Sequence, residues 1–165
     1  MYRALDIAFW LIAKNDAEQK DCDMDEYEGI TNMKIQKLLY FAQGIAFSFF
    51  GIRLFSENLL AWEHGPVIRE VYTEFAKFGR DNIVLDQVAS FNSSGIAAIE
   101  VDTKVREILT DVYECLNKFT AYQLRNISHD ADGPWARVYE PGVNTNVIQL
   151  DQFLVDYFKN HFEQS

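Results

Sequence analysis

Apolar residues recur at helical spacing along most of this chain, and the longest such pattern predicts a helix from Thr31 to Phe50. The apolar positions of this helix are Ile35, Leu38, Leu39, Ala42, Ile45, Ala46 and Phe49. Thr31 suits the N-cap of the helix, and Gly51 suits the residue that follows its last turn. Because apolar groups lie on several sides, we expect this helix to be central and buried on more than one face.

A second row of side chains lies roughly opposite the first on the same helix, and it consists of Gln36, Tyr40, Gln43 and Phe47. Aromatic and polar residues of this kind anchor protein interfaces, so the row is a candidate surface for a partner. The alternative, which we favour, is that the row packs against another helix of the same domain.

A third face of the helix carries Lys34, Lys37 and Gly44. The two lysines are one turn apart and predict a solvated edge. A glycine in mid-helix costs about 1 kcal/mol relative to alanine, and we expect a close crossing with another helix to compensate for it.

Shorter patterns predict the remaining elements. We expect helices at about residues 2–18, 66–78, 102–118 and 120–129, another that starts at Pro134, and a last one at about 151–163. Short strands are expected at 59–62 and 147–148, and residues 92–95 are interpreted as a turn between two short strands. Together these elements predict one domain spanning residues 1–165, mainly α, with six or seven helices around helix 31–50 and minor short β-strands.

Charge narrows the class of protein. The formal net charge is −10, which argues against a general nucleic-acid binder and against docking on an anionic membrane. Much of this charge lies in one stretch, where the acids are Asp16, Glu18, Asp21, Asp23, Asp25, Glu26 and Glu28. The sequence has no apolar run long enough to span a membrane, and no signal peptide is recognisable. We therefore expect a soluble, cytoplasmic protein, with a partner that could be basic.

Few residues suggest catalysis or metal binding. The acidic run that starts at Asp21 fails the EF-hand template, because Glu26 and Asn32 stand where Gly and Glu are required. Cys115 is expected to be a small buried residue of its helix. His129 is either an acid or base beside carboxylates or a structural tie between two helices, and we favour the tie. No catalytic set and no cofactor site are visible, so the residues favour a domain that works by binding proteins.

Three segments carry motifs in a fixed order: residues 30–44, residues 61–67, and residues 124–129 with Pro134 and Trp135. In this order they resemble the Panacea domain, which occurs in antitoxins of toxin–antitoxin systems and in phage-associated proteins. The resemblance covers about residues 3–140. The residues that carry it are Thr31, Lys34, Gln36, Lys37, Leu38, Leu39, Tyr40, Gln43, Gly44, Trp62, Gly65, Pro66, Val67, Ser128, His129, Pro134 and Trp135.

The resemblance implies an antitoxin of a type II-like system that neutralises a cognate protein toxin by direct contact. The motif residues are interpreted as mainly structural, without a catalytic role. The alternatives are an adaptor or phage-encoded protein that delivers its partner to a cytosolic protease and, less favoured, a small-molecule hydrolase that uses His129. The candidate partner-binding residues are Asp21, Asp23, Asp25, Glu26 and Glu28, together with the row Gln36, Tyr40, Gln43 and Phe47.

Overall fold

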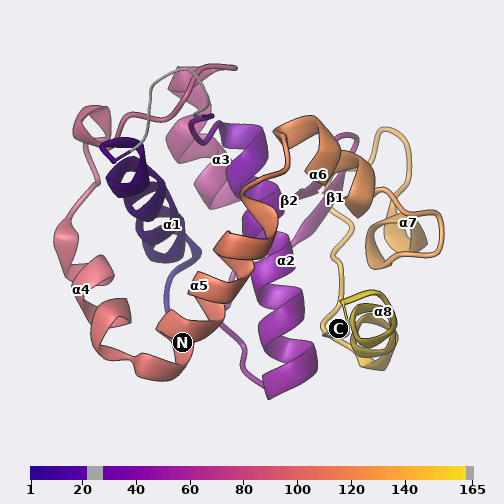
Figure 1. Cartoon of the computed structure of the whole chain (residues 1–165). Coiled ribbons are helices and arrows are strands. Elements are labelled where there is room, and N and C mark those ends of the chain that lie inside the picture. Colours follow the sequence, from indigo (N-terminus) through magenta and orange to yellow (C-terminus); the bar gives the residue numbers. More distant parts are fainter. Residues whose placement is uncertain (22–27, 163–165) are drawn as a thin grey trace.

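One helix, α2 (Asn32–Phe50), lies at the centre of the structure, and most of its 19 residues are buried. The structure is a computed structural model that describes residues 1–21 and 28–162. Helices α1, α3, α5, α6 and α8 all pack against α2 (Figure 1). The fold is mainly α, as predicted from the sequence.

The other elements surround this helix. The remaining α-helices are α1 (Ala4–Gln19), α3 (Arg69–Phe75), α4 (Ser93–Val101), α5 (Thr103–Leu116), α6 (Ala121–Ser128), α7 (Pro134–Val138) and α8 (Gln152–Phe162). Two short 3-10 helices are η1 (Ala76–Phe78) and η2 (Leu85–Gln87). Strands β1 (Leu60–Trp62) and β2 (Gly65–Val67) form an antiparallel pair, in which Ala61 faces Pro66.

Local capping chemistry sets the helix ends where the sequence predicted them. The Thr31 hydroxyl accepts a hydrogen bond from the Lys34 amide at 3.2 Å, and Gly51 ends α2 with a left-handed φ of 66°. Thr120 forms a complete capping box at the start of α6. The Asp151 carboxylate accepts from the Leu154 amide at 3.0 Å and so caps α8.

The prediction of a helix that starts at Pro66 was wrong, because Pro66 lies in strand β2 and helix α3 begins only at Arg69. Gly65 has a φ of 106° and turns the chain into the hairpin. A proline lacks an N–H and is tolerated at the edge of a sheet. Hydrogen bonds from α2 then hold the Pro66 carbonyl and the Ile68 amide in this extended segment.

Residues 92–95 do not form a turn between two strands, as predicted, but begin helix α4. The Asn92 side chain accepts from the Ser94 amide at 3.2 Å and acts as the N-cap. Gly95 packs closely against the Asp6 side chain, where α4 lies on α1. The strand expected at 147–148 is reduced to an isolated bridge between Val147 and Leu60.

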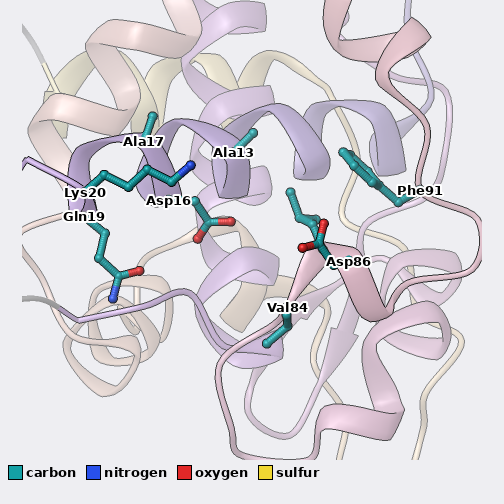
Figure 2. Close-up of a pocket in the computed structure, with 9 residues that line it drawn as sticks. Ala13, Asp16, Ala17, Gln19, Lys20, Val84, Asp86 and Phe91 are labelled. Carbon is teal, nitrogen blue, oxygen red and sulfur yellow. The ribbon is translucent and has the colours of Figure 1, made fainter.

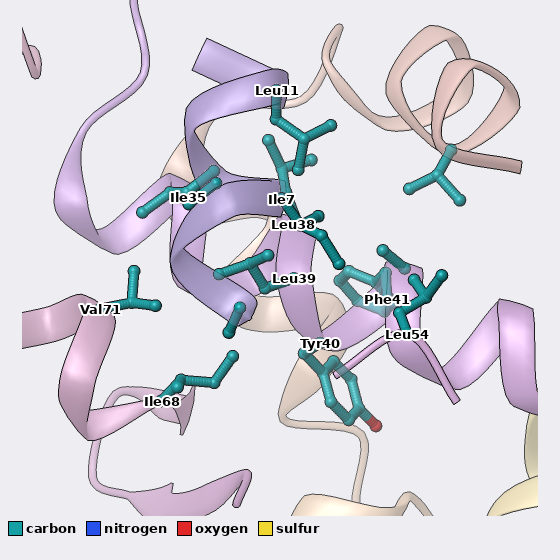
Figure 3. Close-up of a cluster of buried hydrophobic side chains, with 14 of the residues drawn as sticks. Ile7, Leu11, Ile35, Leu38, Leu39, Tyr40, Phe41, Leu54, Ile68 and Val71 are labelled. Carbon is teal, nitrogen blue, oxygen red and sulfur yellow. The ribbon is translucent and has the colours of Figure 1, made fainter. Parts of the chain in front are cut away.

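The core consists of apolar side chains from α1 and α2, joined by residues of the adjoining segments (Figure 3). Members labelled there include Ile7 and Leu11 on α1, Ile35, Leu38 and Leu39 on α2, and Leu54, Ile68 and Val71 beyond them. Cys115, in contrast, is exposed on α5, so the prediction of a buried cysteine was wrong.

A second, aromatic part of the core joins α2 to the C-terminal helix α8. The rings of Tyr40 and Phe158 meet edge to face with centroids 5.6 Å apart, and Phe41 packs against Phe162 at the same centroid distance. Gly44 lies directly against the Phe158 ring, which confirms the close helix crossing predicted for this glycine.

We predict that Gly44→Ala destabilises the protein by about 1–3 kcal/mol, because overpacking of a tight core has costs of this size. The added methyl group would overlap the fully buried Phe158 ring. This loss should exceed the gain in helix propensity of about 1 kcal/mol. Urea titration followed by circular dichroism measures the change.

The double variant Gly44→Ala with Phe158→Leu is the control for this prediction. A smaller side chain at position 158 should relieve the overlap, so the double variant should lose less free energy of unfolding than the two single losses added together. Wild-type stability of Gly44→Ala alone would contradict the close crossing.

Candidate functional site

Four polar side chains that belong to the motif are buried along α2, namely Lys34, Gln36, Lys37 and Gln43, each 1% exposed. The amide of Gln36 accepts from the Ile68 N–H at 2.8 Å. The amide of Gln43 accepts from the Leu54 N–H and donates to the Phe55 carbonyl, both at 2.8 Å. The two glutamine side chains thus satisfy backbone N–H and C=O groups that have no partner in a sheet.

The lysines were predicted to form a solvated edge, and this prediction was wrong. The Lys34 ammonium donates to the Asn117 carbonyl at 2.8 Å, and the Lys37 ammonium donates to the Pro66 carbonyl at 3.1 Å. Each lysine therefore ties α2 to another segment through a main-chain oxygen, Lys34 to the end of α5 and Lys37 to strand β2. We call Lys34, Gln36, Lys37 and Gln43 together the polar row of α2.

Lys37 has no described carboxylate beside it to balance its charge. Burial lowers the pKa of Lys37 to about 7, and the nearby Arg125 cation lowers it in the same direction. The side chain packs against Gly65, where a β-carbon would collide with the lysine chain and with the Ser128 hydroxyl. Gly65, Lys37 and Ser128 therefore meet at one tight contact inside the domain.

Lys34 differs from Lys37 because a carboxylate lies near it. Burial lowers the pKa of Lys34, and Glu28 opposes that effect. The Glu28 carboxylate lies 4.0 Å from the Lys34 ammonium and is half exposed. One of the acids proposed to contact a partner therefore also neutralises a buried charge of its own chain.

His129 ties two parts of the fold together. Its Nδ1 lies 2.8 Å from the Arg125 carbonyl, and its Nε2 lies 2.9 Å from the Glu63 carbonyl in the β1–β2 turn. The ring packs on Trp135 with centroids 3.8 Å apart, and the Trp135 indole donates to the Trp62 carbonyl. These contacts agree with the structural interpretation of His129, because the ring packs on Trp135 at the start of α7 and also joins α6 to the hairpin.

The Asp130 carboxylate, next to His129 in the chain, has other partners. Asp130 accepts from the Asp132 amide at 3.1 Å and from the Tyr157 hydroxyl at 2.9 Å. These two hydrogen bonds, with His161 nearby, lower the pKa of Asp130. Asp130 thus holds the α6–α7 loop against α8, and the geometry offers no pairing of His129 with Asp130 for acid–base chemistry.

The candidate partner row on α2 is not on the surface. Gln36, Tyr40 and Gln43 are each 1% exposed, and Phe47 is half-buried against the core. The expectation of a partner surface is corrected for this row, because its side chains are used in packing and in loop hydrogen bonds. The row instead packs within the domain, which is the alternative favoured from the sequence.

The acidic candidates lie around the end of α1. Asp21 is exposed just after the helix, and Glu28 is exposed just before α2. Asp23, Asp25 and Glu26 lie outside the described residues. The acidic stretch therefore stays a candidate contact surface, of which the structure describes the two ends.

A groove of about 590 Å³ runs along α1 where η2 faces it (Figure 2). On one side it is lined by Ala13, Asp16, Ala17 and Gln19 of α1 and by Lys20, which follows the helix. The facing wall contains Val84, Asp86 and Phe91. We call this feature the α1 groove. Partial burial raises the pKa of Asp16, while Lys20 opposes and Asp86 reinforces that change.

Sequence reasoning missed most of the α1 groove. Asp16 was counted as one of the acids at the end of the first helix, but Val84, Asp86 and Phe91 lie in a stretch without a clear pattern. The exposure of Val84, 43%, is a signal that only the folded chain gives.

The described residues give no sign of a metal centre or a membrane span. Among them, no three His, Cys, Asp or Glu side chains gather closely enough to hold a metal ion. No helix within residues 1–21 and 28–162 has both the length and the apolar character needed to cross a bilayer.

Comparison with known proteins gives two matches. The sequence model of the family described as "Antitoxin SocA-like, Panacea domain" matches residues 35–136. The chain is also 33% identical over 136 residues to Antitoxin SocA of Caulobacter vibrioides (strain NA1000 / CB15N), which covers 79% of this chain and 72% of that protein. No solved structure matches.

We predict that the stability of the protein rises between pH 7 and about 9.5 because of Lys37. A buried lysine with a pKa near 7 binds fewer protons than the same lysine in the unfolded chain, whose pKa is near 10.5. The folded state therefore gains relative stability as the pH rises through this window. The slope due to one group is at most about 1.4 kcal/mol per pH unit.

The measurement compares wild type with Lys37→Met by urea titration at several pH values. The wild-type free energy of unfolding should rise relative to that of Lys37→Met, whatever their difference at pH 7. Lys159→Met, which removes an exposed lysine of α8, should keep the wild-type slope. Parallel slopes for wild type and Lys37→Met would show that Lys37 stays protonated throughout.

Proposed function

Because this chain belongs to the Antitoxin SocA-like, Panacea domain family, we propose that it neutralises a cognate protein toxin by binding to it directly. The observation that carries this proposal is the similarity to an antitoxin over most of the chain. Membership of an antitoxin family implies that the partner is a toxin. Neutralisation by direct binding is the part that we propose.

The internal contacts of the motif residues support a binding role for the domain. The polar row of α2, together with His129 and Trp135, is used for internal hydrogen bonds and packing. These residues maintain the scaffold, so partner choice falls to the outer surface. Surface loops and helix faces can change without loss of the core.

The distribution of charge supports contact with a basic toxin surface. The net charge is −10, and the acids concentrate between Asp16 and Glu28. Complementary charge mainly accelerates association and selects the partner, while apolar contacts slow dissociation. The acidic stretch would cover a basic substrate-binding site on the toxin and keep its substrate out.

Co-expression with the product of the neighbouring gene tests the class of function. We expect that product to be lethal when expressed alone and harmless together with this chain, and the two purified proteins to form a stable complex. Toxin abundance should be equal with and without this chain, since a blocker leaves the toxin intact. A fall in toxin abundance that depends on a cytosolic protease would instead support the adaptor alternative.

Charge reversal at three acidic residues tests whether the acidic stretch attracts a basic toxin surface. We predict that Asp21→Lys, Asp23→Lys and Asp25→Lys, made together, weaken toxin binding at least tenfold and reduce its dependence on salt. Isothermal titration or surface plasmon resonance at two ionic strengths measures both effects.

The matched control for that triple variant lies on α5. Glu107, Asp111 and Glu114 are exposed and share one face of this helix. Their conversion to lysine changes the net charge by the same amount away from the acidic stretch. Equal effects of the two triple variants would show that only the total charge matters.

A further inference from the structure

The α1 groove holds two carboxylates on its opposite walls. Asp16 lies on α1 and Asp86 on η2, and Figure 2 shows both side chains at the groove. Neither accepts a hydrogen bond from another described residue or forms an ion pair within 4.0 Å with one. Lys20 is the nearby group of opposite charge, and it only partly offsets the burial of Asp16.

Apart from Gln19 and Lys20, the other residues that line the groove are apolar. Ala13 and Ala17 stand one turn apart on α1, so a partner backbone can approach the helix closely. Val84 is 43% exposed on the facing wall, and Phe91 closes one end of the lining. A volume of about 590 Å³ falls in the range of roughly 300–1,000 Å³ that specific sites occupy.

We propose that the α1 groove binds a segment of the toxin that presents an arginine or lysine beside apolar side chains. This inference rests on the proposed function and names the part of the surface that anchors the partner. The cation would lie between Asp16 and Asp86, and the neighbouring apolar side chains would cover Ala13, Ala17 and Val84.

Charge complementarity favours this occupant over two others. The connector of the same chain carries Asp23, Asp25 and Glu26, which would add negative charge to a site that already holds two carboxylates. A second copy of the chain has a net charge of −10 and is repelled for the same reason. A basic segment of another protein is attracted.

The binding energy would come from two sources. A partly buried carboxylate interacts more strongly with a cation than an exposed one does, because less water screens the pair. An arginine fork can donate to both carboxylates at once, which adds directional specificity. Burial of Val84 and the alanine face would then slow dissociation.

Three variants of this chain test the groove, with the toxin encoded by the neighbouring gene as the probe. Asp86→Lys places a positive charge where the cation would bind. Ala17→Trp fills the groove from an exposed position of α1. Glu140→Lys makes the same charge reversal at an exposed position of the α7–α8 loop, which does not line the groove.

We expect Asp86→Lys and Ala17→Trp to weaken toxin binding at least tenfold and to reduce protection of cells, while Glu140→Lys binds as wild type does. Thermal unfolding of each variant checks that the fold is kept. Wild-type affinity of both groove variants would overturn the inference and leave the proposed function standing. Failure of wild type itself to bind or protect would overturn the proposed function.

Sedimentation of the isolated wild-type chain tests whether a second copy of the chain occupies the groove. The inference predicts a monomer at concentrations where the toxin binds. A dimer that Ala17→Trp disrupts would show that a second copy occupies the groove, and it would overturn the assignment to a toxin segment.

Discussion

The fold depends on one constraint: the long polar side chains that are buried along the central helix α2 need hydrogen-bond partners. In α2 the polar row meets this requirement by bonding to backbone groups outside the helix, at Leu54 and Phe55, at Pro66 and Ile68, and at Asn117. The constraint acts in both directions, because those backbone groups would otherwise be buried without partners. Loss of one partner leaves the other unsatisfied, which costs more than the hydrogen bond itself contributes.

This arrangement separates the scaffold from the surface. Side chains of α2 help to hold the segments around it, so these segments keep their paths without an extended sheet. Position 86 in η2 and position 17 in α1 can therefore change without touching a core contact. An antitoxin built in this way can exchange its partner-contacting residues while its central helix stays the same.

Periodicity and caps made much of the helical fold predictable, because those signals are local. Thr31, Gly51 and Asp151 each act through residues within one turn. The errors occurred where distant contacts decide. A Gly-Pro pair suits a helix start or an edge strand, and distant partners select the strand here: β1 pairs with the segment, and Gln36 and Lys37 bond to its backbone. Lys34 and Lys37 likewise look solvent-exposed until the loops that accept their hydrogen bonds are in place.

The candidate contact surface was harder to predict, because its two walls come from separate parts of the chain. Asp16 becomes part of a groove only because Asp86 lies on the opposite wall. No sequence pattern predicts that these two positions lie near each other. Once they are joined, the groove and the acidic stretch are adjacent, since Lys20 lines the groove and Asp21 follows it. Exposed charges in the stretch are screened beyond about 8 Å at physiological salt, so they act mainly on the approach of a partner. The partly buried Asp16 is screened less, and it can hold the partner after contact.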